Sequence, residues 1–492
     1  MSLSEPLRIK SHPILTFDTK EDVPFTFNKT LLHGTKSDCI ASALHAKGIK
    51  QFTTSLRYNR ARGFFCGIGK CSSCLMRVNG IPNVRTCIAP LRPHINVETQ
   101  EKLGAWPDAS FQGTPQKTIE VDILIVGAGP AGLCASIEAA KQGASVLLVD
   151  ENQRVGGQLI KQTHKFFGSR QEKAGTRGID IAQELEGEIQ ELETKGRATL
   201  LLDSTVFGSY ESQCDGFTFG VVKREQYLST LVRVICQSVI FACGAMENML
   251  LFPGNDLPGV YGAGAVQTLM NVYGVRPGTN VLMVGAGNVG LIVSYQLLQA
   301  GIQVDRVVEA APTIGGYHVH AAKLRRCGVP IYTSHSIKEV YGEDQVEGAV
   351  IVRLDEHWQP ITGSEETISC DTVCLAVGLT PSTRMLAQMN TPTEEIPEAG
   401  GSVALHDETM MTTIDRVYVA GDSSGIEEAS TAMIEGKIAG VSAAYSLGYD
   451  QQAKELRHNY ERQLQGLRAG PFGEKPRIAK RNITRFMRNI NV

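Results

Sequence analysis

The sequence contains no uninterrupted apolar run of about 18 residues, which is the length that a membrane-spanning helix needs. The N-terminal segment MSLSEPLRIKSHP also lacks the apolar core of a secretory signal peptide. We therefore expect no transmembrane segment and a cytoplasmic location. The formal net charge of -3 at pH 7 provides no positive excess, so we expect no nucleic acid among the partners.

The twelve cysteines lack the arrangement of a disulfide framework. Four of them crowd into residues 66–87, and the others are scattered through stretches with strand or helix patterns. In a cytosolic protein the crowded set is typical of a metal site, and the scattered cysteines are expected to be reduced core residues.

Proline is scarce beside glycine, with 20 prolines against 50 glycines, and 42% of the residues are hydrophobic. This composition favours a folded α/β chain with many tight turns over a disordered chain. A length of 492 residues predicts about three domains.

The strongest pattern is the segment 121–159, VDILIVGAGPAGLCASIEAAKQGASVLLVDENQRVGGQL, which predicts a strand, a glycine-rich turn, a helix and a second strand. In its G-x-G-x-x-G turn, the first glycine permits a tight turn, the second lets a pyrophosphate approach the backbone, and the third lets the helix pack closely. The helix N-terminus offers free N–H groups to phosphate. The candidate cofactor-binding residues of this turn are Gly127, Gly129, Pro130, Ala131 and Gly132.

The second strand of this segment ends at Asp150, 18 residues past Gly132. A carboxylate at this place binds the ribose hydroxyls of an adenine dinucleotide. The next candidates are Glu151, then Gly157 and Gln158 in the loop RVGGQ, which lies beside the nucleotide and flavin in two-dinucleotide flavoproteins. We expect this segment to bind an adenine dinucleotide; the alternative is a tight turn without a ligand.

Two later segments return to this first domain. QSVIFACG predicts an apolar strand with a glycine turn and adds Ala242 and Gly244 to the candidates. VYVAGD predicts a strand that ends in Gly421 and Asp422. A carboxylate at Asp422, beside a helix N-terminus, can bind a flavin ribityl hydroxyl while the helix end faces the pyrophosphate. This motif makes FAD the leading cofactor of the first domain, which is then discontinuous in sequence.

The segment 280–301, NVLMVGAGNVGLIVSYQLLQAG, repeats the strand, glycine turn and helix pattern. Its candidate residues are Gly285, Gly287 and Gly290, followed by Glu309 at the end of the next strand. An acid at Glu309 favours NAD over NADP, because a carboxylate repels a 2′-phosphate, although Arg306 nearby weakens that choice. A domain of this kind also keeps its shape without a ligand, so an empty second site stays open.

The four crowded cysteines have the spacing C-x4-C-x2-C-x12-C, which is typical of a plant-type [2Fe–2S] cluster. The candidate ligands are Cys66, Cys71, Cys74 and Cys87. After the third of them, LMRV-NG-IPNVRTC predicts a hairpin with an Asn-Gly turn that returns Cys87 towards the others. The alternative is a zinc site, but four-cysteine zinc sites usually have two C-x2-C pairs and this segment has one.

The predicted fold class is α/β, a two-dinucleotide-binding-domain flavoprotein of the disulfide-reductase type with an N-terminal [2Fe–2S] ferredoxin-like α+β domain. Residues 104–118 are rich in Gly, Pro, Ser and Thr, which indicates an interdomain linker. The other predicted ranges are 1–103 for the [2Fe–2S] domain, 119–275 and 366–448 for the two parts of the FAD-type domain, 276–365 for an inserted NAD(P)-type domain, and 449–492 for a basic C-terminal docking segment.

The order of these motifs resembles one family, the α-type subunits of heteromeric amine and imino-acid dehydrogenases and oxidases. The family includes dye-linked proline and hydroxyproline dehydrogenases, opine oxidase, hydrogen cyanide synthase and heterotetrameric sarcosine oxidase. The segments that carry the resemblance are FTFN, RGFFCGIGKCSSC with PNVRTC, VGAGPAG, FPGNDLPGV, VGAGNVG and VYVAGD. Sarcosine oxidase α-type chains lack the cluster cysteines, whereas this sequence has all four. The tail has no cysteine, so a second C-terminal cluster is not expected.

The resemblance implies an FAD-dependent oxidoreductase component acting on CH–NH donors, in which a β-type FAD amine or imino-acid oxidase subunit oxidises the substrate. This chain would accept the electrons, with FMN at a subunit interface as an option. It would pass them through the [2Fe–2S] cluster to a quinone, dye or ferredoxin-like acceptor. The resemblance also implies a hetero-oligomer, and in some relatives the first pocket holds NAD or another adenine nucleotide.

No catalytic residue stands out in the sequence. His318 and His320 in YHVH are the nearest candidates, and alternate histidines are more often ordinary polar residues. One alternative function is a stand-alone NAD(P)H:acceptor flavin reductase, whose thioredoxin-reductase version needs a redox-active cysteine pair that LPGVYGAGAVQTLM and RVGGQL lack. The other alternative is a scaffold subunit whose nucleotide is only structural.

Overall fold

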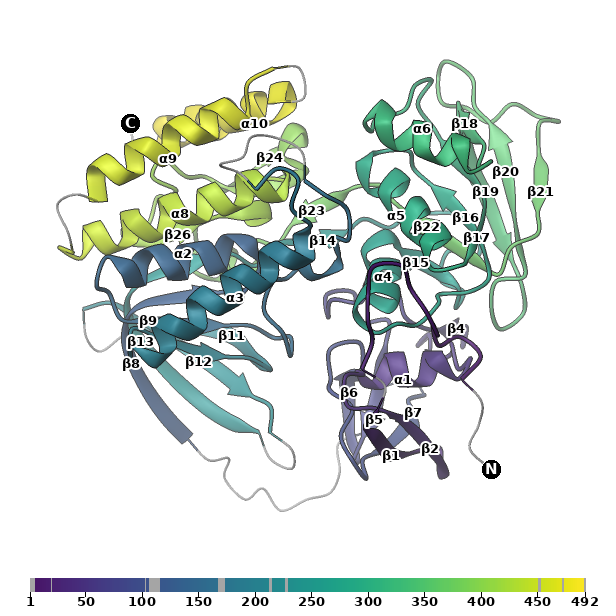
Figure 1. Ribbon diagram of the computed structural model, residues 1–492, viewed down its shortest axis with the longest axis horizontal. Helices are drawn as coiled ribbons and strands as arrows, with labels where there is room; N and C mark the ends of the chain where they lie inside the picture. Colours follow the sequence, from purple (N-terminus) through teal and green to yellow (C-terminus); the bar gives the residue numbers. More distant parts are fainter. Residues whose placement is uncertain are drawn as a thin grey trace. The chain divides into compact units, whose positions relative to one another are not determined.

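The computed structural model of the chain describes residues 5–18, 20–101, 103–105, 116–166, 173–211, 215–225, 229–449, 453–470 and 473–490. The chain forms two compact units (Figure 1). Unit 1 combines residues 1–110 with 247–378, and unit 2 combines 111–246 with 379–492. Strands β14 (Ala245–Glu247) and β23 (Leu379–Pro381) stand where the chain passes from one unit to the other.

The first part of unit 1 is an α+β fold around a five-stranded sheet in the order β2-β1-β7-β5-β6. Strand β1 pairs parallel with β7, and the other neighbours in this sheet are antiparallel. This is the architecture predicted for the N-terminal domain. Its elements are β1 (Asp22–Phe27), β2 (Thr30–Thr35), α1 (Ile40–Ala46), β3 (Thr53–Thr54), β4 (Ala61–Arg62), β5 (Leu75–Val78), β6 (Ile81–Arg85) and β7 (Asn96–Thr99).

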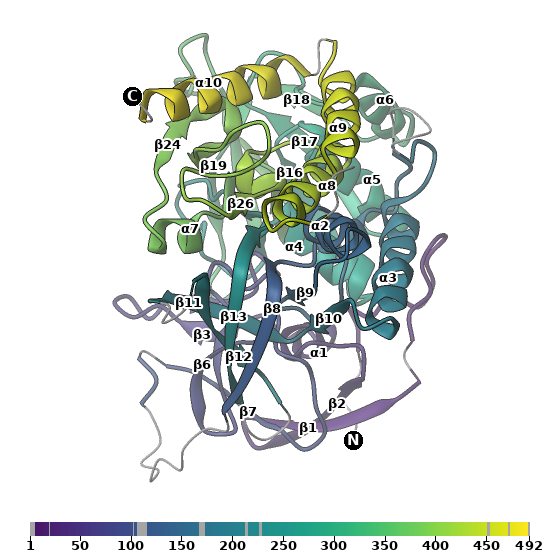
Figure 2. The ribbon, with the colours of Figure 1, turned by 90° about the vertical axis from the view of Figure 1, so that its left-hand side faces the viewer.

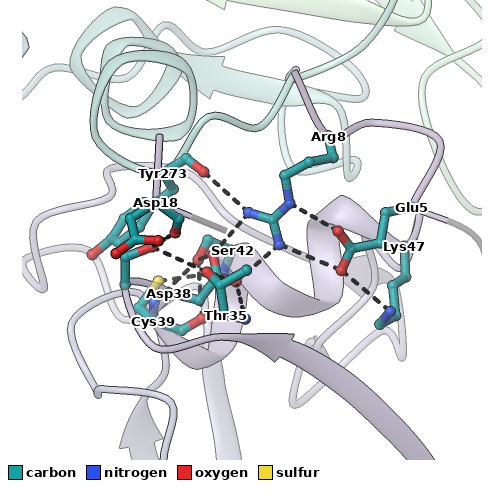
Figure 3. Close-up of polar contacts among 10 residues, drawn as sticks. Glu5, Arg8, Asp18, Thr35, Asp38, Cys39, Ser42, Lys47 and Tyr273 are labelled. Atoms are coloured by element: carbon teal, nitrogen blue, oxygen red, sulfur yellow. Dashed lines mark hydrogen bonds and ion pairs between the residues drawn. The ribbon is translucent and has the colours of Figure 1, made fainter. Parts of the chain in front are cut away.

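Helix α1 begins at a cysteine cap, and the residue before that cap bonds Arg8 of the N-terminal arm. The Cys39 sulfur accepts the N–H of Ser42 at 3.3 Å, and the Ser42 hydroxyl accepts the N–H of Cys39 at 3.1 Å. The buried carboxylate of Asp38, next to this cap, accepts a bond from Arg8 Nη2 at 2.9 Å. Arg8 also donates to the Tyr273 carbonyl at 3.1 Å (Figure 3). The arm therefore ties α1 to the later part of unit 1.

The second part of unit 1 has a parallel sheet in the order β15-β22-β16-β17-β18 and a separate antiparallel sheet β19-β20-β21. On β16, Val281 and Met283 enter one core while Leu282 and Val284 enter another, as in a strand covered on both faces. The elements are β15 (Val260–Gly262), α4 (Ala263–Gln267), η2 (Thr268–Val272), β16 (Asn280–Val284), α5 (Asn288–Gln299), β17 (Gln303–Glu309), α6 (His318–Arg326), β18 (Ile331–Thr333), β19 (His335–Tyr341), β20 (Gly348–Arg353), β21 (Glu366–Ile368) and β22 (Thr372–Leu375).

This inserted domain extends past both ends of the predicted range 276–365. Strand β15 precedes that range, β22 follows it, and both pair within the parallel sheet. The sequence pattern marks only the central strand, turn and helix, whereas a strand of three residues such as β15 is too short to show a period.

Unit 2 is built on a sheet in the order β10-β9-β8-β13-β12-β11, with β26 also pairing with β13. The pairs β10–β9, β9–β8, β8–β13 and β13–β26 are parallel, whereas the pairs β13–β12 and β12–β11 are antiparallel. Figure 2 shows the long strands β8 and β13 beside each other. The strands are β8 (Gln116–Val126), β9 (Val146–Val149), β10 (Ala198–Leu201), β11 (Ser204–Tyr210), β12 (Phe217–Lys223), β13 (Thr230–Phe241), β26 (Val417–Val419) and the hairpin β24 (Thr393–Ile396) with β25 (Gly401–Ala404).

Strand β8 starts inside the predicted linker 104–118, at Gln116, because its first residues pair with β13. Residues 106–115 of that linker lie outside the described residues. Along β8, Ile123 and Ile125 pack in one core with α2, α3 and α8, while Leu124 packs in the core of the opposite face. Both faces of this part of the sheet are therefore covered.

The helix predicted after the first glycine turn is present in unit 2 as α2. No helix within the described residues is long and apolar enough to cross a membrane. The helical elements are α2 (Pro130–Lys141), η1 (Leu159–Lys161), α3 (Gly178–Thr194), α7 (Arg384–Gln388), η3 (Pro397–Ala399), η4 (Gly421–Ser424), α8 (Ala429–Ser446), α9 (Ala453–Leu467) and α10 (Glu474–Ile490).

Helices α2 and α8 pack backbone to backbone through small residues. A Cβ atom added at Gly436 would lie 2.1 Å from the Ala131 carbonyl oxygen, and one added at Gly440 would lie 2.3 Å from the Ala135 carbonyl oxygen. These glycines hold the middle of α8 against the first two turns of α2, which follows the glycine-rich loop.

Replacing Gly436 with alanine is expected to lower the free energy of unfolding by about 1–3 kcal/mol, because the added methyl collides with rigid backbone. This loss outweighs the gain of about 1 kcal/mol that alanine brings to a helix. The matched control is Gly187→Ala in α3, where an added Cβ meets no atom within 4 Å. Denaturant unfolding should show the control as stable as wild type or slightly more stable; equal stability of Gly436→Ala would contradict the close packing.

Candidate functional site

The four predicted cluster cysteines lie together in unit 1. The thiols of Cys71 and Cys87 donate to the Cys66 sulfur, and these bonds hold the pKa of Cys66 well below its usual range. Cys87 also donates to Cys74 and lowers the pKa of that thiol. The bonds to Cys66 raise the pKa of both donors, because a donor that ionises loses its bond. The four sulfurs thus form one connected group without a disulfide.

The backbone of the cysteine loop has the conformations that a wrapping loop requires. Gly67 and Gly69 have φ values of 63° and 72°, and Ser72 has a φ of 62°. A side chain at Gly69 would also lie 2.7 Å from Ile88 Cδ1. Backbone N–H groups point at sulfur, since the Ser73 N–H donates to Cys71 Sγ at 3.5 Å. Such bonds stabilise thiolate ligands and tune a cluster's potential.

The predicted hairpin returns the fourth cysteine to the loop. Strands β5 and β6 pair with Val78 opposite Ile81, and the turn residues Asn79 and Gly80 have φ values of 50° and 80°. Both φ values are positive, as a two-residue turn between twisted strands requires. Beyond the hairpin, the Thr86 hydroxyl donates to the Cys74 carbonyl at 2.7 Å and so holds Cys87 beside Cys74.

Within the described part of the chain, no three His, Cys, Asp or Glu side chains surround one point as ligands of a single ion would. The fit of the loop to a [2Fe–2S] cluster therefore rests on the thiol contacts, the positive-φ glycines and the N–H groups aimed at sulfur. Cys66, Cys74 and Cys87 are buried and Cys71 is exposed, so the loop has one open edge.

The cysteine loop also rests directly on the inserted domain, which the sequence did not indicate. The Gly262 N–H donates to the Phe65 carbonyl at 3.0 Å, next to Cys66. A Cβ at Gly67 would lie 3.2 Å from Ala265 Cα of α4. Phe65 and Cys66 share a hydrophobic core with strands β16, β17 and β22. The loop is thus held by the domain of the second glycine turn.

The first glycine turn, in unit 2, has the geometry of a phosphate-binding loop. Gly127 has a φ of 107°, and a Cβ there would lie 2.3 Å from the Ala242 carbonyl oxygen. A Cβ at Gly132 would lie 1.7 Å from the Gly127 carbonyl oxygen, so the third glycine packs against the first. At Gly129, the N-cap of α2, an added Cβ meets nothing within 4 Å. Of the three glycines, Gly129 is the one with open space beside its backbone, and it lies where a pyrophosphate is expected.

The carboxylate of Asp150 is fixed by the turn that precedes it. Its Oδ2 accepts the Ala128 N–H at 2.7 Å, and its Oδ1 accepts the Asn152 N–H at 2.7 Å. Burial raises the pKa of Asp150, while these N–H bonds oppose that shift. Oδ1 also accepts the Asn152 side-chain amide at 2.8 Å, so it is the second lone pair of Oδ2 that can still accept a ribose hydroxyl. The neighbouring Glu151 contributes its carbonyl to Arg224 Nη2 at 2.5 Å.

The RVGGQ loop closes over the first glycine turn. The Gly156 N–H donates to the Ala128 carbonyl at 2.8 Å. Gly157 has a φ of 52°, and a Cβ there would lie 2.8 Å from Gly129 Cα. Gln158 next to it is exposed. The predicted residues of this loop therefore meet the glycine turn through their backbone.

The two distant motifs of the first domain converge on the same turn. Ala242 contacts Gly127, and the Ser423 hydroxyl donates to the Gly244 carbonyl at 3.2 Å. Gly421 has a φ of 66°, and a Cβ there would lie 2.8 Å from Ala131 Cβ at the start of α2. The Gly-Asp turn thus lies beside the N-terminus of α2.

Burial raises the pKa of Asp422 from its usual 3.8 to about 7, and the carboxylates of Glu435 and Glu427 add to the shift while Lys480 opposes it. The folded chain keeps this proton up to about pH 7, and the unfolded chain releases it near pH 4. Unfolding therefore releases a proton between these values, and stability falls as the pH rises from about 4 to 7.

We expect this linkage to lower the free energy of unfolding of the nucleotide-free chain by about 1.4 kcal/mol per pH unit, and by up to about 4 kcal/mol at pH 7. In Asp422→Asn this part of the slope is absent, so the variant gains stability relative to wild type between pH 5 and 8. Denaturant unfolding of both proteins across this range measures the difference. A difference independent of pH would show that Asp422 ionises normally.

The second glycine turn, in unit 1, repeats the geometry of the first. A Cβ at Gly285 would lie 2.3 Å from the Ala376 carbonyl oxygen, one at Gly290 would lie 2.0 Å from the Gly285 carbonyl oxygen, and one at Gly287 meets nothing within 4 Å. Glu309 Oε2 accepts the Ala286 N–H at 2.7 Å, as Asp150 accepts that of Ala128. The second turn is therefore fully formed.

Arg306 is occupied by other partners. It bonds Asp305 through Nε at 2.7 Å and Glu366 through Nη1 at 2.6 Å, and its guanidinium lies over the Tyr332 ring. Arg306 therefore opposes the predicted preference for NAD less than the sequence suggested. His320 is buried and stacks on Tyr317 with ring centroids 6.1 Å apart, which is a packing role.

Sequence reasoning missed a second closing loop at Gly315 and Gly316. The Gly316 N–H donates to the Ala286 carbonyl at 3.0 Å, and Gly156 makes the corresponding bond to Ala128 in the first domain. The signal was present, because a Gly-Gly pair begins six residues after the acid in both domains, at 156 after 150 and at 315 after 309.

Residues 121–436 match the model of the family described as pyridine nucleotide-disulphide oxidoreductase. The chain belongs to this family. Residues 20–102 match the 2Fe-2S iron-sulfur cluster binding domain. The chain therefore uses FAD and a [2Fe–2S] cluster, which confirms these two predicted cofactors. The individual roles of the candidate residues stay predictions.

Curated relatives agree with the predicted resemblance. The alpha chain of sarcosine oxidase from Rhizobium meliloti (strain 1021) is 28% identical over 427 residues, covering 74% of this chain and 40% of the relative. An opine oxidase subunit of Agrobacterium tumefaciens (strain Ach5) is 27% identical over 351 residues, which are 66% of each chain. Hydrogen cyanide synthase subunit HcnB of Pseudomonas protegens is 26% identical over 360 residues, 69% of this chain and 74% of the relative. The chain spans less than half the length of the sarcosine oxidase alpha chains.

Solved structures show the fold. L-proline dehydrogenase from P. horikoshii has a TM-score of 0.70 at 23% identity, covering 94% of this chain and 79% of that chain. T. acidophilum thioredoxin reductase has a TM-score of 0.52 at 20% identity, covering 67% of this chain and 99% of that chain. The predicted fold class, a disulfide-reductase-like flavoprotein with an N-terminal [2Fe–2S] domain, is confirmed.

Proposed function

We propose that this chain is the electron-transferring subunit of a flavin and iron–sulfur dehydrogenase acting on CH–NH donors such as proline, hydroxyproline or an opine-like imino acid. A β-type FAD subunit oxidises the substrate, and this chain carries the electrons through flavin and the [2Fe–2S] cluster to an acceptor. The sarcosine oxidase and opine oxidase relatives are named as single subunits of their enzymes, and they support this class of donor and the presence of a partner.

The observation that carries the proposal is the presence, in one chain, of a four-thiol loop and two formed dinucleotide turns. FAD supplies two-electron chemistry and a [2Fe–2S] cluster exchanges single electrons, so the pair converts one into the other. A chain of this composition is suited to passing electrons to a quinone, a dye or a ferredoxin-like protein.

Each group of residues has a role of its own in the proposal. Cys66, Cys71, Cys74 and Cys87 hold the cluster as thiolates, with the loop N–H groups bonding sulfur. In unit 2, the α2 N-terminus at Gly129 receives the pyrophosphate, Asp150 binds the ribose, and Asp422 accepts from a ribityl hydroxyl. In the second turn, Glu309 binds the ribose of an NAD or another adenine nucleotide.

FMN at a subunit interface, a hetero-oligomer and a cytoplasmic location stay predictions. The choice between FAD, NAD and another adenine nucleotide for each of the two turns belongs to the same proposal, since the geometry of both turns suits an adenine dinucleotide.

The test is purification of the chain alone and together with the products of its neighbouring genes. Dye reduction driven by an imino acid should appear only in the complex, while the isolated chain should contain iron and flavin. Imino-acid oxidation by the isolated chain would contradict the proposed division of labour. A colourless chain without iron or flavin would refute both redox functions and leave the scaffold.

A second candidate is an NAD(P)H:acceptor flavin reductase, and the formed second turn favours it. Glu309 is held by two backbone N–H groups, those of Ala286 at 2.7 Å and Ala311 at 2.9 Å, as a ribose-binding acid should be. This function predicts that the isolated chain oxidises NADH with a dye. Failure of NADH to bleach the flavin of the isolated chain would exclude it.

A further inference from the structure

The basic C-terminal tail, which the sequence predicts to be a docking segment, reaches the Gly-Asp turn of the first nucleotide site. Arg468 follows α9 and Lys480 lies on α10, and both side chains are only 13% exposed. Their partners are the buried carboxylates of Glu427 and Glu435, at 7% and 3% exposure. Two cations and two carboxylates therefore meet in the interior of unit 2.

Glu435 joins the turn to the tail. Its Oε2 accepts the Gly421 N–H at 3.0 Å and the Ser424 hydroxyl at 2.7 Å, which are the two ends of η4. Its Oε1 accepts from Arg468 Nη2 at 2.6 Å and from Lys480 Nζ at 2.7 Å. One carboxylate thus binds the Gly421–Ser424 turn on one side and the tail on the other.

Lys480 also contacts the turn directly. Its Nζ donates to the Ser424 carbonyl at 2.9 Å and to the Ser424 hydroxyl at 2.8 Å. Arg468 meanwhile donates to the Glu427 carboxylate from Nε at 2.9 Å and from Nη2 at 2.6 Å. The turn is therefore held at its start through Glu435 and at its end by Lys480.

The buried carboxylates of Glu427 and Glu435 need both cations of the tail as partners. A buried carboxylate that loses its partner is strongly unfavourable, because the desolvated charge is left uncompensated. Asp422 lies between Ser423 and Gly421 in the same turn, so any shift of the backbone that avoids the uncompensated charge moves Asp422 as well.

We propose that Arg468 and Lys480 are positioning residues that hold the Gly421–Ser424 turn, and with it Asp422, in the conformation that binds the nucleotide of unit 2. The C-terminal tail is then a working part of the first nucleotide site. The inference rests on the proposed binding of a nucleotide at this turn, and it needs neither the partner subunit nor the amine substrate.

The test uses Lys480→Met in the full-length chain, with Lys475→Met as the matched control because Lys475 is exposed on the same helix. We measure the nucleotide that each purified chain retains, its dissociation constant for FAD after removal and re-addition, and hydrogen exchange across residues 417–426. Lys480→Met should bind FAD at least about tenfold more weakly, since it loses bonds to a charged donor. It should also exchange faster in this segment.

Lys480→Arg should restore most of the affinity, because a guanidinium can reach Glu435 and the Ser424 carbonyl. If Lys480→Met does not fold, the double variant Glu435→Gln with Lys480→Met leaves Arg468 paired with Glu427 and is measured in its place. Unchanged affinity and exchange in Lys480→Met or the double variant would overturn the inference. A wild-type chain that binds no nucleotide in unit 2 would instead refute the underlying proposal, and the Gly129 variant described below separates these two failures.

Discussion

The Cys71→Ser variant is expected to lose the [2Fe–2S] cluster, with iron content falling close to zero and the visible cluster bands disappearing. Four thiolates ligate such a cluster, and a hydroxyl is a poor replacement for one of them. Cys71 is exposed, so the exchange of sulfur for oxygen costs the fold of the loop little. Flavin should remain, because the proposed flavin site lies in unit 2. Iron analysis and visible absorbance of the purified chain measure both cofactors.

The matched control is Cys39→Ser in the same domain. The Cys39 sulfur caps α1 by accepting the Ser42 N–H at 3.3 Å, and serine is a preferred cap residue that keeps this bond. The control should therefore keep full iron content. Full iron content in Cys71→Ser would refute the ligand assignment, and loss of iron in both variants would show that the substitutions act through folding.

The Gly129→Val variant is expected to lose the flavin while the protein stays folded. An added Cβ at this position meets no protein atom within 4 Å, and Gly129 has a φ of -75°, which any residue adopts. The new methyl groups would instead occupy the space above the N-terminus of α2, where the pyrophosphate belongs. We expect affinity to fall by at least about a hundredfold, or roughly 3 kcal/mol. Flavin absorbance and thermal unfolding of the purified variant test this.

Gly287→Val is the paired experiment at the second turn, where an added Cβ also meets nothing within 4 Å. This variant should keep its flavin and lose any adenine nucleotide bound in unit 1, which mass spectrometry of the released nucleotides detects. The opposite result, with flavin lost from Gly287→Val and kept in Gly129→Val, would place the flavin at the second turn and contradict the assignment.

Local features of the site were predictable because short-range chemistry determines them. The Asn79-Gly80 turn, the start of α2 at Pro130 and the acids Asp150 and Glu309 all follow from spacing and from the few residues that suit each backbone conformation. Such features are encoded within some thirty residues of sequence, as a βαβ unit is.

Features that depend on distant segments were missed. The cysteine loop bonds Gly262 and packs on α4, which lie about two hundred residues later in the chain. Nothing in the local pattern around Cys66 encodes that contact. The basic tail likewise showed charge and apolar residues, but only the fold reveals that Lys480 reaches Ser424. Domain ranges shifted for the same reason, since β15 and β22 join a sheet far away in sequence.

The most direct test of the proposed electron path is electron paramagnetic resonance of the complex, frozen after mixing with an imino-acid substrate and without any acceptor. We expect the signal of a reduced [2Fe–2S] cluster when both the substrate and the partner protein are present, and no such signal from the isolated chain with substrate. The Cys71→Ser complex should show no cluster signal. Reduction of the cluster by substrate in the isolated chain, or an oxidised cluster in a complex that still reduces dye, would contradict the account.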